Sequence, residues 1–419
     1  MNRVKARLPS LLAAFVAAML VFNSCSDAEN SDSTMVVEGK LQRPWDFDDE
    51  PDSQILSRLG RELRTRNDVE SSPAIADSTL YFGSHDGSLH ALDADTGREK
   101  WGFRTRGWIE SSPAVSEGVV FVGSHDGHLY AVDAATGLER WSFSTREAVH
   151  SSPAVSDRVV YFGSRDNALH AVDASTGNER WSFQTRGWVE SSPAAASGIV
   201  YFGSRDNTLY AIDVSTQEEQ WRFITRGWID SSPVTADGMV CFGSNDNYVY
   251  AVDARSGLVR WSFKTAGWAE GSPAVSGSVA CFGSRDGNLY SVNAETGEEL
   301  WRFKTDNWIR SSPTIAGGNV YFGSNDGNLY AVDVDTGQER WRFRTGAWVQ
   351  TSPAIAGGVL CFGSNDGRVY ALDAETGREK WVFHVGGSLR SLQPVSDITA
   401  NAILGRHSRC IAMLAVPRM

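Results

Sequence analysis

A segment of forty residues occurs eight times in this chain without insertion or deletion, and this repeat limits the fold more than any other feature. The copies start at Ser71, Ser111, Ser151, Ser191, Ser231, Gly271, Ser311 and Thr351. A fixed period of this length indicates a propeller, a solenoid or an array of small units. Every copy carries a tryptophan at the same place, and these are Trp101, Trp141, Trp181, Trp221, Trp261, Trp301, Trp341 and Trp381.

Each repeat reads as four short strands joined by hairpins. In the copy that starts at Ser311, turn residues separate the runs SPTIA, NVYFGS, NLYAVDV and ERWRFRT. Runs rich in Val, Tyr, Phe and Trp between Gly, Asp and Asn are typical of strands, and none shows the 3.6-residue period of a helix. Four such strands predict one antiparallel blade, whose faces are covered only when copies are stacked radially. The predicted fold is therefore an all-β propeller of four-stranded antiparallel blades, with a linear solenoid as the alternative.

A local motif makes the fold prediction more specific. Residues 331–341 read AVDVDTGQERW and match the pattern A-x-D-x-x-T-G-x-x-x-W, which recurs with small departures in all eight repeats. This pattern resembles the tryptophan-docking motif of the pyrroloquinoline quinone (PQQ)-like propeller repeat, and the resemblance covers about residues 59–414. It implies that the eight repeated tryptophans pack between neighbouring blades. Within the family, size and layout are most similar to the BamB lipoproteins of the outer-membrane β-barrel assembly machinery.

The N-terminal region predicts export and lipid anchoring. Residues 1–24 combine three basic residues with the apolar run 11–22, and Cys25 follows directly. A basic start, a short apolar core and a small residue before the cut are typical of a secretory signal, and a cysteine at the cut indicates a bacterial lipoprotein acylated at Cys25. Ordinary secretion with an incidental cysteine is the alternative. Residues 25–57 are polar and acidic, which predicts a flexible tether, and residues 58–419 are expected to form one propeller domain.

The two ends of the repeat region complement each other. Residues 62–66 match an outer-strand segment, residues 102–106, whereas residues 391–414 are a degenerate copy of the first three strands. Joining these ends in one blade would close a ring and cover its apolar edges. We therefore expect eight regular repeats plus a split terminal repeat that closes the ring, although the family resemblance implies eight blades.

The net charge and the cysteine and histidine positions limit which classes of partner and which kinds of site the chain is expected to have. The formal charge of −12, which the basic signal makes less negative than that of the mature chain, argues against nucleic acid and anionic membrane surfaces as partners. Cys241, Cys281 and Cys361 replace a strand tyrosine, so they are expected to be small core residues. His125 and His128 lack the carboxylate or cysteine spacing of a metal site. The sequence thus predicts no metal, no cofactor and no catalytic residues.

Six further tryptophans occur at one position, in the linker between the outer strand of one blade and the first strand of the next. We call them the rim tryptophans: Trp108, Trp188, Trp228, Trp268, Trp308 and Trp348. Acids stand two residues later in four linkers, at Glu110, Glu190, Asp230 and Glu270. The tryptophans either pack across blade junctions or form, with the acids, an exposed binding rim.

Two functional hypotheses follow. The first is a non-enzymatic, monomeric propeller that is lipid-anchored to the outer membrane, faces the periplasm, and acts as a scaffold for envelope proteins. Resemblance to the BamB lipoproteins implies components of outer-membrane β-barrel assembly as partners. The alternative is a PQQ-like quinoprotein enzyme or a sensor of a small ligand or glycan. PQQ-dependent dehydrogenases place a vicinal disulfide against the cofactor, and this chain has no adjacent cysteine pair.

Overall fold

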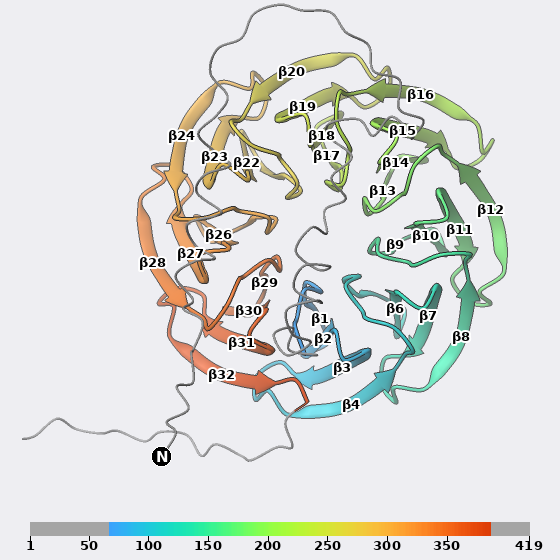
Figure 1. Cartoon of the computed structure of the whole chain (residues 1–419), viewed down its shortest axis with the longest axis horizontal. Coiled ribbons are helices and arrows are strands. Elements are labelled where there is room, and N and C mark those ends of the chain that lie inside the picture. The colour runs from blue at the N-terminus through green and yellow to red at the C-terminus, as the bar shows by residue number, and fades with distance from the viewer. Residues whose placement is uncertain (1–66, 387–419) are drawn as a thin grey trace, which may run out of the picture. The chain divides into compact units, whose positions relative to one another are not determined.

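The computed structural model describes residues 67–386, which form eight four-stranded antiparallel sheets arranged as the blades of a ring (Figure 1). In every blade the strands pair in chain order, the first lying nearest the centre of the ring and the fourth at its periphery. The predicted all-β propeller with four-stranded blades is therefore confirmed. Among the described residues, no helix has the length and apolar character that crossing a membrane requires.

The strands have nearly the same bounds in each repeat. Blades one and two comprise β1 (Ala74–Ala76), β2 (Thr79–Gly83), β3 (Ser88–Asp93), β4 (Glu99–Arg104), β5 (Ala114–Ser116), β6 (Val119–Ser124), β7 (His128–Asp133) and β8 (Glu139–Ser144). Blades three and four comprise β9 (Ala154–Ser156), β10 (Val159–Ser164), β11 (Ala168–Asp173), β12 (Glu179–Gln184), β13 (Ala194–Ala196), β14 (Ile199–Ser204), β15 (Thr208–Asp213) and β16 (Glu219–Ile224). Blades five and six comprise β17 (Val234–Ala236), β18 (Met239–Ser244), β19 (Tyr248–Asp253), β20 (Val259–Lys264), β21 (Ala274–Ser276), β22 (Val279–Gly283), β23 (Asn288–Asn293) and β24 (Glu299–Lys304). Blades seven and eight comprise β25 (Thr314–Ala316), β26 (Asn319–Gly323), β27 (Asn328–Asp333), β28 (Glu339–Arg344), β29 (Ala354–Ala356), β30 (Val359–Ser364), β31 (Arg368–Asp373) and β32 (Glu379–His384).

Burial along the strands explains their sequences. The second strand of a blade is buried at nearly every position, because a neighbouring blade covers each of its faces, and it accordingly reads as a continuous apolar run. The fourth strand alternates between exposed and half-buried side chains, as a peripheral strand should. Each apolar cluster combines two consecutive blades; Phe183 of β12, for example, meets Phe202 of β14 edge-on at 6.1 Å between ring centroids. The core is thus a series of blade junctions. Cys241, Cys281 and Cys361 are fully buried free thiols in it, which confirms their predicted place.

The repeated tryptophans join each blade to the next. Trp301 Nε1 donates a hydrogen bond to the carbonyl oxygen of Val334 at 2.9 Å. Its ring lies against Gly337, where an added Cβ would come within 2.6 Å of Trp301 Cδ2 and where φ is +69°. Only glycine satisfies both demands without strain. The same indole-to-carbonyl bond occurs at seven of the eight junctions, made by Trp101, Trp141, Trp221, Trp261, Trp301, Trp341 and Trp381.

The remaining junction departs from the motif. Trp181 faces the turn in which Gln217 replaces the glycine of the other repeats, and Gln217 has a positive φ of 64°. Among the described residues, the indole nitrogen of Trp181 makes no hydrogen bond to the next blade, although Trp181 and Val214 both pack against the apolar cluster that the two blades share. A side chain where glycine is required accounts for the exception.

A closed belt of serine hydrogen bonds runs around the first strands. The backbone N–H of each second serine in the SSP motif donates to the hydroxyl of its counterpart forty residues later, as in Ser72 to Ser112 at 3.1 Å. The series continues through Ser112, Ser152, Ser192, Ser232, Ser272, Ser312 and Ser352. Ser352 then donates to Ser72 at 2.8 Å, so the belt has no end.

The closure of the ring differs from the predicted split repeat, because the eighth blade adjoins the first directly. Trp381 of β32 donates to the carbonyl oxygen of Ala94 at 3.0 Å, the contact made at other junctions. Val69 packs into the cluster shared by these blades, and Asn67 Nδ2 donates to the carbonyl oxygen of Val385 at 2.8 Å. Eight consecutive blades therefore suffice. Residues 1–66 and 387–419, with the predicted signal, Cys25, the tether and the split repeat, lie outside the described residues.

We expect the indole-to-glycine junction to contribute strongly to stability. Trp221 is buried, so Trp221→Ala should lower the free energy of unfolding by ~3–5 kcal/mol through lost packing and a residual cavity. Arg222→Ala removes an exposed side chain of the same strand and is the matched control, with an expected loss below about 1 kcal/mol. Denaturant titration of both variants measures the difference, and equal losses would contradict this role for Trp221.

The same reasoning gives a stabilising substitution. Gln217→Gly should raise the free energy of unfolding by up to about 1 kcal/mol, because a left-handed conformation costs a non-glycine residue ~1–2 kcal/mol and glycine loses part of that gain in the unfolded chain. Gly257→Gln, the reverse change at a regular junction, should destabilise the protein. A fall in stability on Gln217→Gly would mean that the glutamine side chain contributes to this junction.

Candidate functional site

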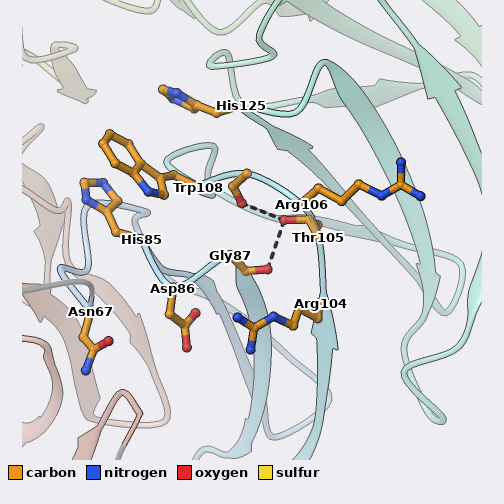
Figure 2. Close-up of a pocket in the computed structure, with 10 residues that line it drawn as sticks. Asn67, His85, Asp86, Gly87, Arg104, Thr105, Arg106, Trp108 and His125 are labelled. Atoms are coloured by element: carbon orange, nitrogen blue, oxygen red, sulfur yellow. Dashed lines mark hydrogen bonds between the residues drawn. The ribbon is translucent and has the colours of Figure 1, made fainter.

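The linkers that carry the rim tryptophans are held firmly at both ends. In the linker after blade one, Thr105 Oγ1 donates to the carbonyl oxygens of Gly87 and Gly107 at 3.0 and 2.8 Å (Figure 2). The next residue after Trp108 is Ile109, which is fully buried against Gly83; a Cβ on that glycine would overlap the Ile109 side chain. The carbonyl oxygen of Trp108 accepts the N–H of His125 from the next blade at 2.9 Å. Backbone bonds of this kind fix the linkers as a continuous, ordered surface.

The rim tryptophans are neither fully buried nor fully exposed. Trp108, Trp188, Trp308 and Trp348 are 41, 37, 44 and 50 % exposed, whereas Trp228 and Trp268 are less exposed. Each ring is therefore partly covered by protein and partly accessible to a partner. This combination of area and rigidity is common at protein interfaces.

Arginines from the β2–β3-type turns lie between successive rim tryptophans. The Arg205 guanidinium lies 5.1 Å from the ring centroid of Trp188 and 4.6 Å from that of Trp228. Arg285 has the same place between Trp268 and Trp308, at 4.2 and 4.8 Å. Cation–π contacts of this geometry hold the indoles in position. Tryptophan and arginine therefore alternate in two sectors of the ring, one around Arg165 and Arg205 and the other around Arg285.

The four rim acids have little side-chain exposure and are paired, three with arginines and Glu110 with histidines, so the structure does not present them as a free acidic rim. Glu190 is 2.7 Å from both Arg165 and Arg205, and Arg205 Nε also lies 3.0 Å from Asp230 Oδ1. Glu270 likewise meets Arg285 at 2.6 Å and Arg310 at 3.0 Å. Residues fifteen, twenty-five and forty positions apart in the chain thereby form one polar layer.

Burial sets the protonation behaviour of this layer. Burial raises the pKa of Glu190, but His150, Arg205 and Arg165 outweigh it and hold the pKa below its usual range. For Asp230, burial and the nearby carboxylates of Glu190 and Glu270 raise the pKa to about 6 against the opposing charge of Arg205. Two neighbouring carboxyl groups of this layer therefore have pKa values shifted in opposite directions.

Glu110, the fourth rim acid, meets histidines instead of arginines. Its Oε2 lies 2.7 Å from His150 Nε2 and 3.4 Å from His125 Nε2, and its Oε1 lies 3.0 Å from His85 Nε2. Burial would lower the pKa of His150, but Glu190 and Glu110 raise it to about 9. Burial likewise opposes ionisation of Glu110, yet the three imidazoles hold the pKa of this carboxyl well below its usual range.

An open hollow of about 620 Å³ lies beside this histidine group. His85 and Trp108 stack along one side of it, with ring centroids 4.9 Å apart and an angle of 12° between the planes (Figure 2). His125 lies beyond the indole, and Asp86, Arg104 and Arg106 also line the hollow, with the side chain of Arg106 pointing away from the indole. The hollow is therefore bounded by aromatic, cationic and imidazole groups.

The grouping of Glu110 with His85, His125 and His150 was not predicted from the sequence. The nearest two of these residues in the chain, Glu110 and His125, are fifteen positions apart, so no short motif contains them. The signal that could have found them is their register: two blades on, Arg165 and Arg205 occupy the positions of His85 and His125 and both bind Glu190, and His150 stands at a rim-acid position. The repeat itself thus specifies which positions meet.

Comparison with known proteins agrees with the fold and identifies the family. The sequence matches the family described as outer membrane protein assembly factor BamB over residues 45–184, 145–227, 185–268 and 245–415, which together span most of the chain. No curated protein shows a significant match to the sequence.

Three solved structures illustrate the likeness in fold. The computationally designed Ika8 protein has a TM-score of 0.67 at 19 % identity, with 74 % of this chain and 97 % of that chain covered. BamB from Moraxella catarrhalis has a TM-score of 0.62 at 20 % identity, with coverage of 75 and 96 %. A europium-containing methanol dehydrogenase has a TM-score of 0.56 at 16 % identity, with coverage of 72 and 81 %. At these identities the structural matches establish the propeller fold, whereas the family match over most of the sequence establishes kinship: this chain belongs to the family of the outer membrane protein assembly factor BamB.

Proposed function

We propose that this protein is an exported, lipid-anchored propeller that binds envelope proteins through its rim tryptophans and takes part in outer-membrane β-barrel assembly. The observation that carries this proposal is the row of half-exposed indoles on rigid linkers, in a chain of the BamB family. Aromatic side chains that are already ordered lose little conformational freedom on binding, so they suit a role as anchors. The signal layout before Cys25 supports delivery to the envelope.

The alternation of tryptophan and arginine indicates which contacts a partner would make. The acids are occupied by ion pairs, so the partly exposed indoles and the arginines beside them are the groups that a partner would meet at the rim. A polypeptide segment with exposed apolar side chains would cover this area and exclude water from it. We infer that unfolded or partly assembled outer-membrane proteins, or other components of their assembly, supply such segments.

The first test replaces two of the most exposed indoles. Trp308→Ala with Trp348→Ala introduces the residue that the chain itself carries at the equivalent position, Ala148, so the melting temperature should stay close to that of the wild type. The loss of each tryptophan should weaken binding of the partner by about 2 kcal/mol. The double variant should therefore no longer capture β-barrel assembly components from envelope extract. Thermal melting and capture are measured on the same preparation. Unchanged capture by a well-folded double variant would refute the rim as the binding surface.

The second test concerns the anchor. Cys25→Ala should move the protein from the membrane fraction to the soluble fraction, because acylation at that cysteine is the proposed attachment. Cell fractionation and mass measurement of the N-terminal peptide provide the readout, and Cys410→Ala is the control because it should leave the protein in the membrane fraction. A wild-type protein without an acyl chain would exclude lipid anchoring while leaving the rim test unaffected.

A further inference from the structure

The near-perfect repeat is broken in one sector of the ring. At the position of His85 and His125 the other six blades carry Arg165, Arg205, Asn245, Arg285, Asn325 and Asn365. At the position of His150 the preceding and following linkers carry the acids Glu110 and Glu190. Three imidazoles therefore replace charged or amide groups around one carboxylate, at positions that the repeat brings together. Such a replacement changes the chemistry of the site from ion pairing to ligation by nitrogen and oxygen.

The geometry of the group suits a small divalent ion. The ligand atoms of Glu110, His125 and His150 all lie within 4.8 Å of one another. In a tetrahedral zinc site, bonds of ~2.0–2.1 Å place neighbouring ligand atoms about 3.3 Å apart. The separations from Glu110 Oε2 to the two nitrogens, 2.7 and 3.4 Å, lie on either side of that value. Small side-chain rotations would bring all three atoms to bonding distance.

Unsatisfied nitrogens provide a second, independent observation. His85 Nε2 and His125 Nε2 are buried and make no hydrogen bond with any described residue. His85 is the more buried, with 10 % of its side chain exposed. Its Nε2 lies 3.0 Å from Glu110 Oε1, so His85 is in close contact with the carboxylate. Buried polar atoms of native proteins normally have a partner, so a metal ion bound by His125 Nε2 would satisfy that nitrogen.

The surroundings hold the ligands in place. Trp108 stacks on His85 and also meets His125 at 5.9 Å between ring centroids, so the indole fixes both imidazoles (Figure 2). The backbone N–H groups of His85 and His125 donate to the carbonyl oxygens of Asp68 and Trp108, each at 2.9 Å. Preformed ligands of this kind lower the entropic cost of binding an ion.

We propose that Glu110, His125 and His150 bind one divalent transition-metal ion, of which Zn²⁺ is the representative, and that His85 positions Glu110 from behind. Imidazole nitrogen with a single carboxylate suits zinc and its neighbours in the first transition row and is a poor set for Ca²⁺ or Mg²⁺, which prefer oxygen. Three protein ligands leave a fourth position open to water or to a side chain of a partner. The ion would also tie together three consecutive parts of the ring: the linker after blade one, blade two and the linker after blade two.

The test uses the mature chain, purified without a histidine tag and stripped with a chelator. Zinc content after dialysis should be one ion per chain, and Co²⁺ should give the visible absorption of a four-coordinate nitrogen–oxygen site. Zinc should raise the melting temperature, because it binds the folded ring and the unfolded chain lacks the preformed site. Wild-type protein that binds no stoichiometric zinc would overturn the proposal.

The repeat supplies a matched variant. His125→Arg with His150→Glu installs the residues found at the equivalent positions one blade on, Arg165 and Glu190, and should melt in chelator within a few degrees of the wild type. It should lose the Co²⁺ absorption and the zinc-dependent rise in melting temperature. His85→Gln should weaken zinc binding by about 10- to 100-fold, the range typical of residues that orient a ligand. His128→Gln, in the same turn as His125 but outside the group, should bind as tightly as the wild type.

If the double variant is unstable, the single variants His150→Gln and His128→Gln still test which residues bind the ion. The single variant His150→Gln should lose the Co²⁺ absorption on its own, since a two-ligand site cannot hold the ion at micromolar concentration. Equal binding by His150→Gln, or by the double variant, would overturn the assignment of ligands. An equal loss of binding on His128→Gln would also do so, because it would place the ion elsewhere.

Discussion

The contact between an indole and the glycine turn of the next blade is the interaction on which the rest of this structure depends. The two middle strands of each blade are apolar on both faces, so a blade alone would expose a large part of its core. The tryptophan at the periphery and the serine belt near the centre hold neighbouring blades together at both radii. Stability therefore lies in the junctions, as expected for a repeat protein in which each unit contacts only its neighbours.

The local structure could be read from the sequence because it depends on local chemistry. The turn after residue 333 is an example: Asp333 Oδ1 accepts hydrogen bonds from the backbone N–H and hydroxyl of Thr336, and Gly337 adopts positive φ, all within five residues. Strand identity, hairpins and the placement of Cys241 in the core followed from such short-range rules. The manner of ring closure did not, because it depends on the rotation between blades, which packing at the junctions sets.

In the candidate site, too, local features could be predicted from the sequence, whereas contacts between distant residues could not. Repeat spacing identified the linkers and the rim tryptophans, but spacing alone could not tell that Arg205 would lie between Trp188 and Trp228 and neutralise Glu190 beneath them. The pairing of Glu110 with His125 and His150 has the same origin in contacts fifteen and forty residues apart. In a chain of nearly identical repeats, a candidate site is most easily recognised where the same positions stay in contact but carry different residue types.

At the junction between blades eight and one, the two halves of a linker come from opposite ends of the repeat region and are not joined by a peptide bond. By repeat register, Gly386 and Asn67 correspond to Arg106 and Gly107, two residues joined by a peptide bond in the first linker. At the seam, the Asn67 side chain bonds Val385, and His85 takes its usual partner from Asp68. Residues 67–386 thus form a ring that noncovalent contacts close at one of eight equivalent linkers. Because the contacts across this seam match those at the other junctions, the blade packing itself does not determine which of the eight linkers is open.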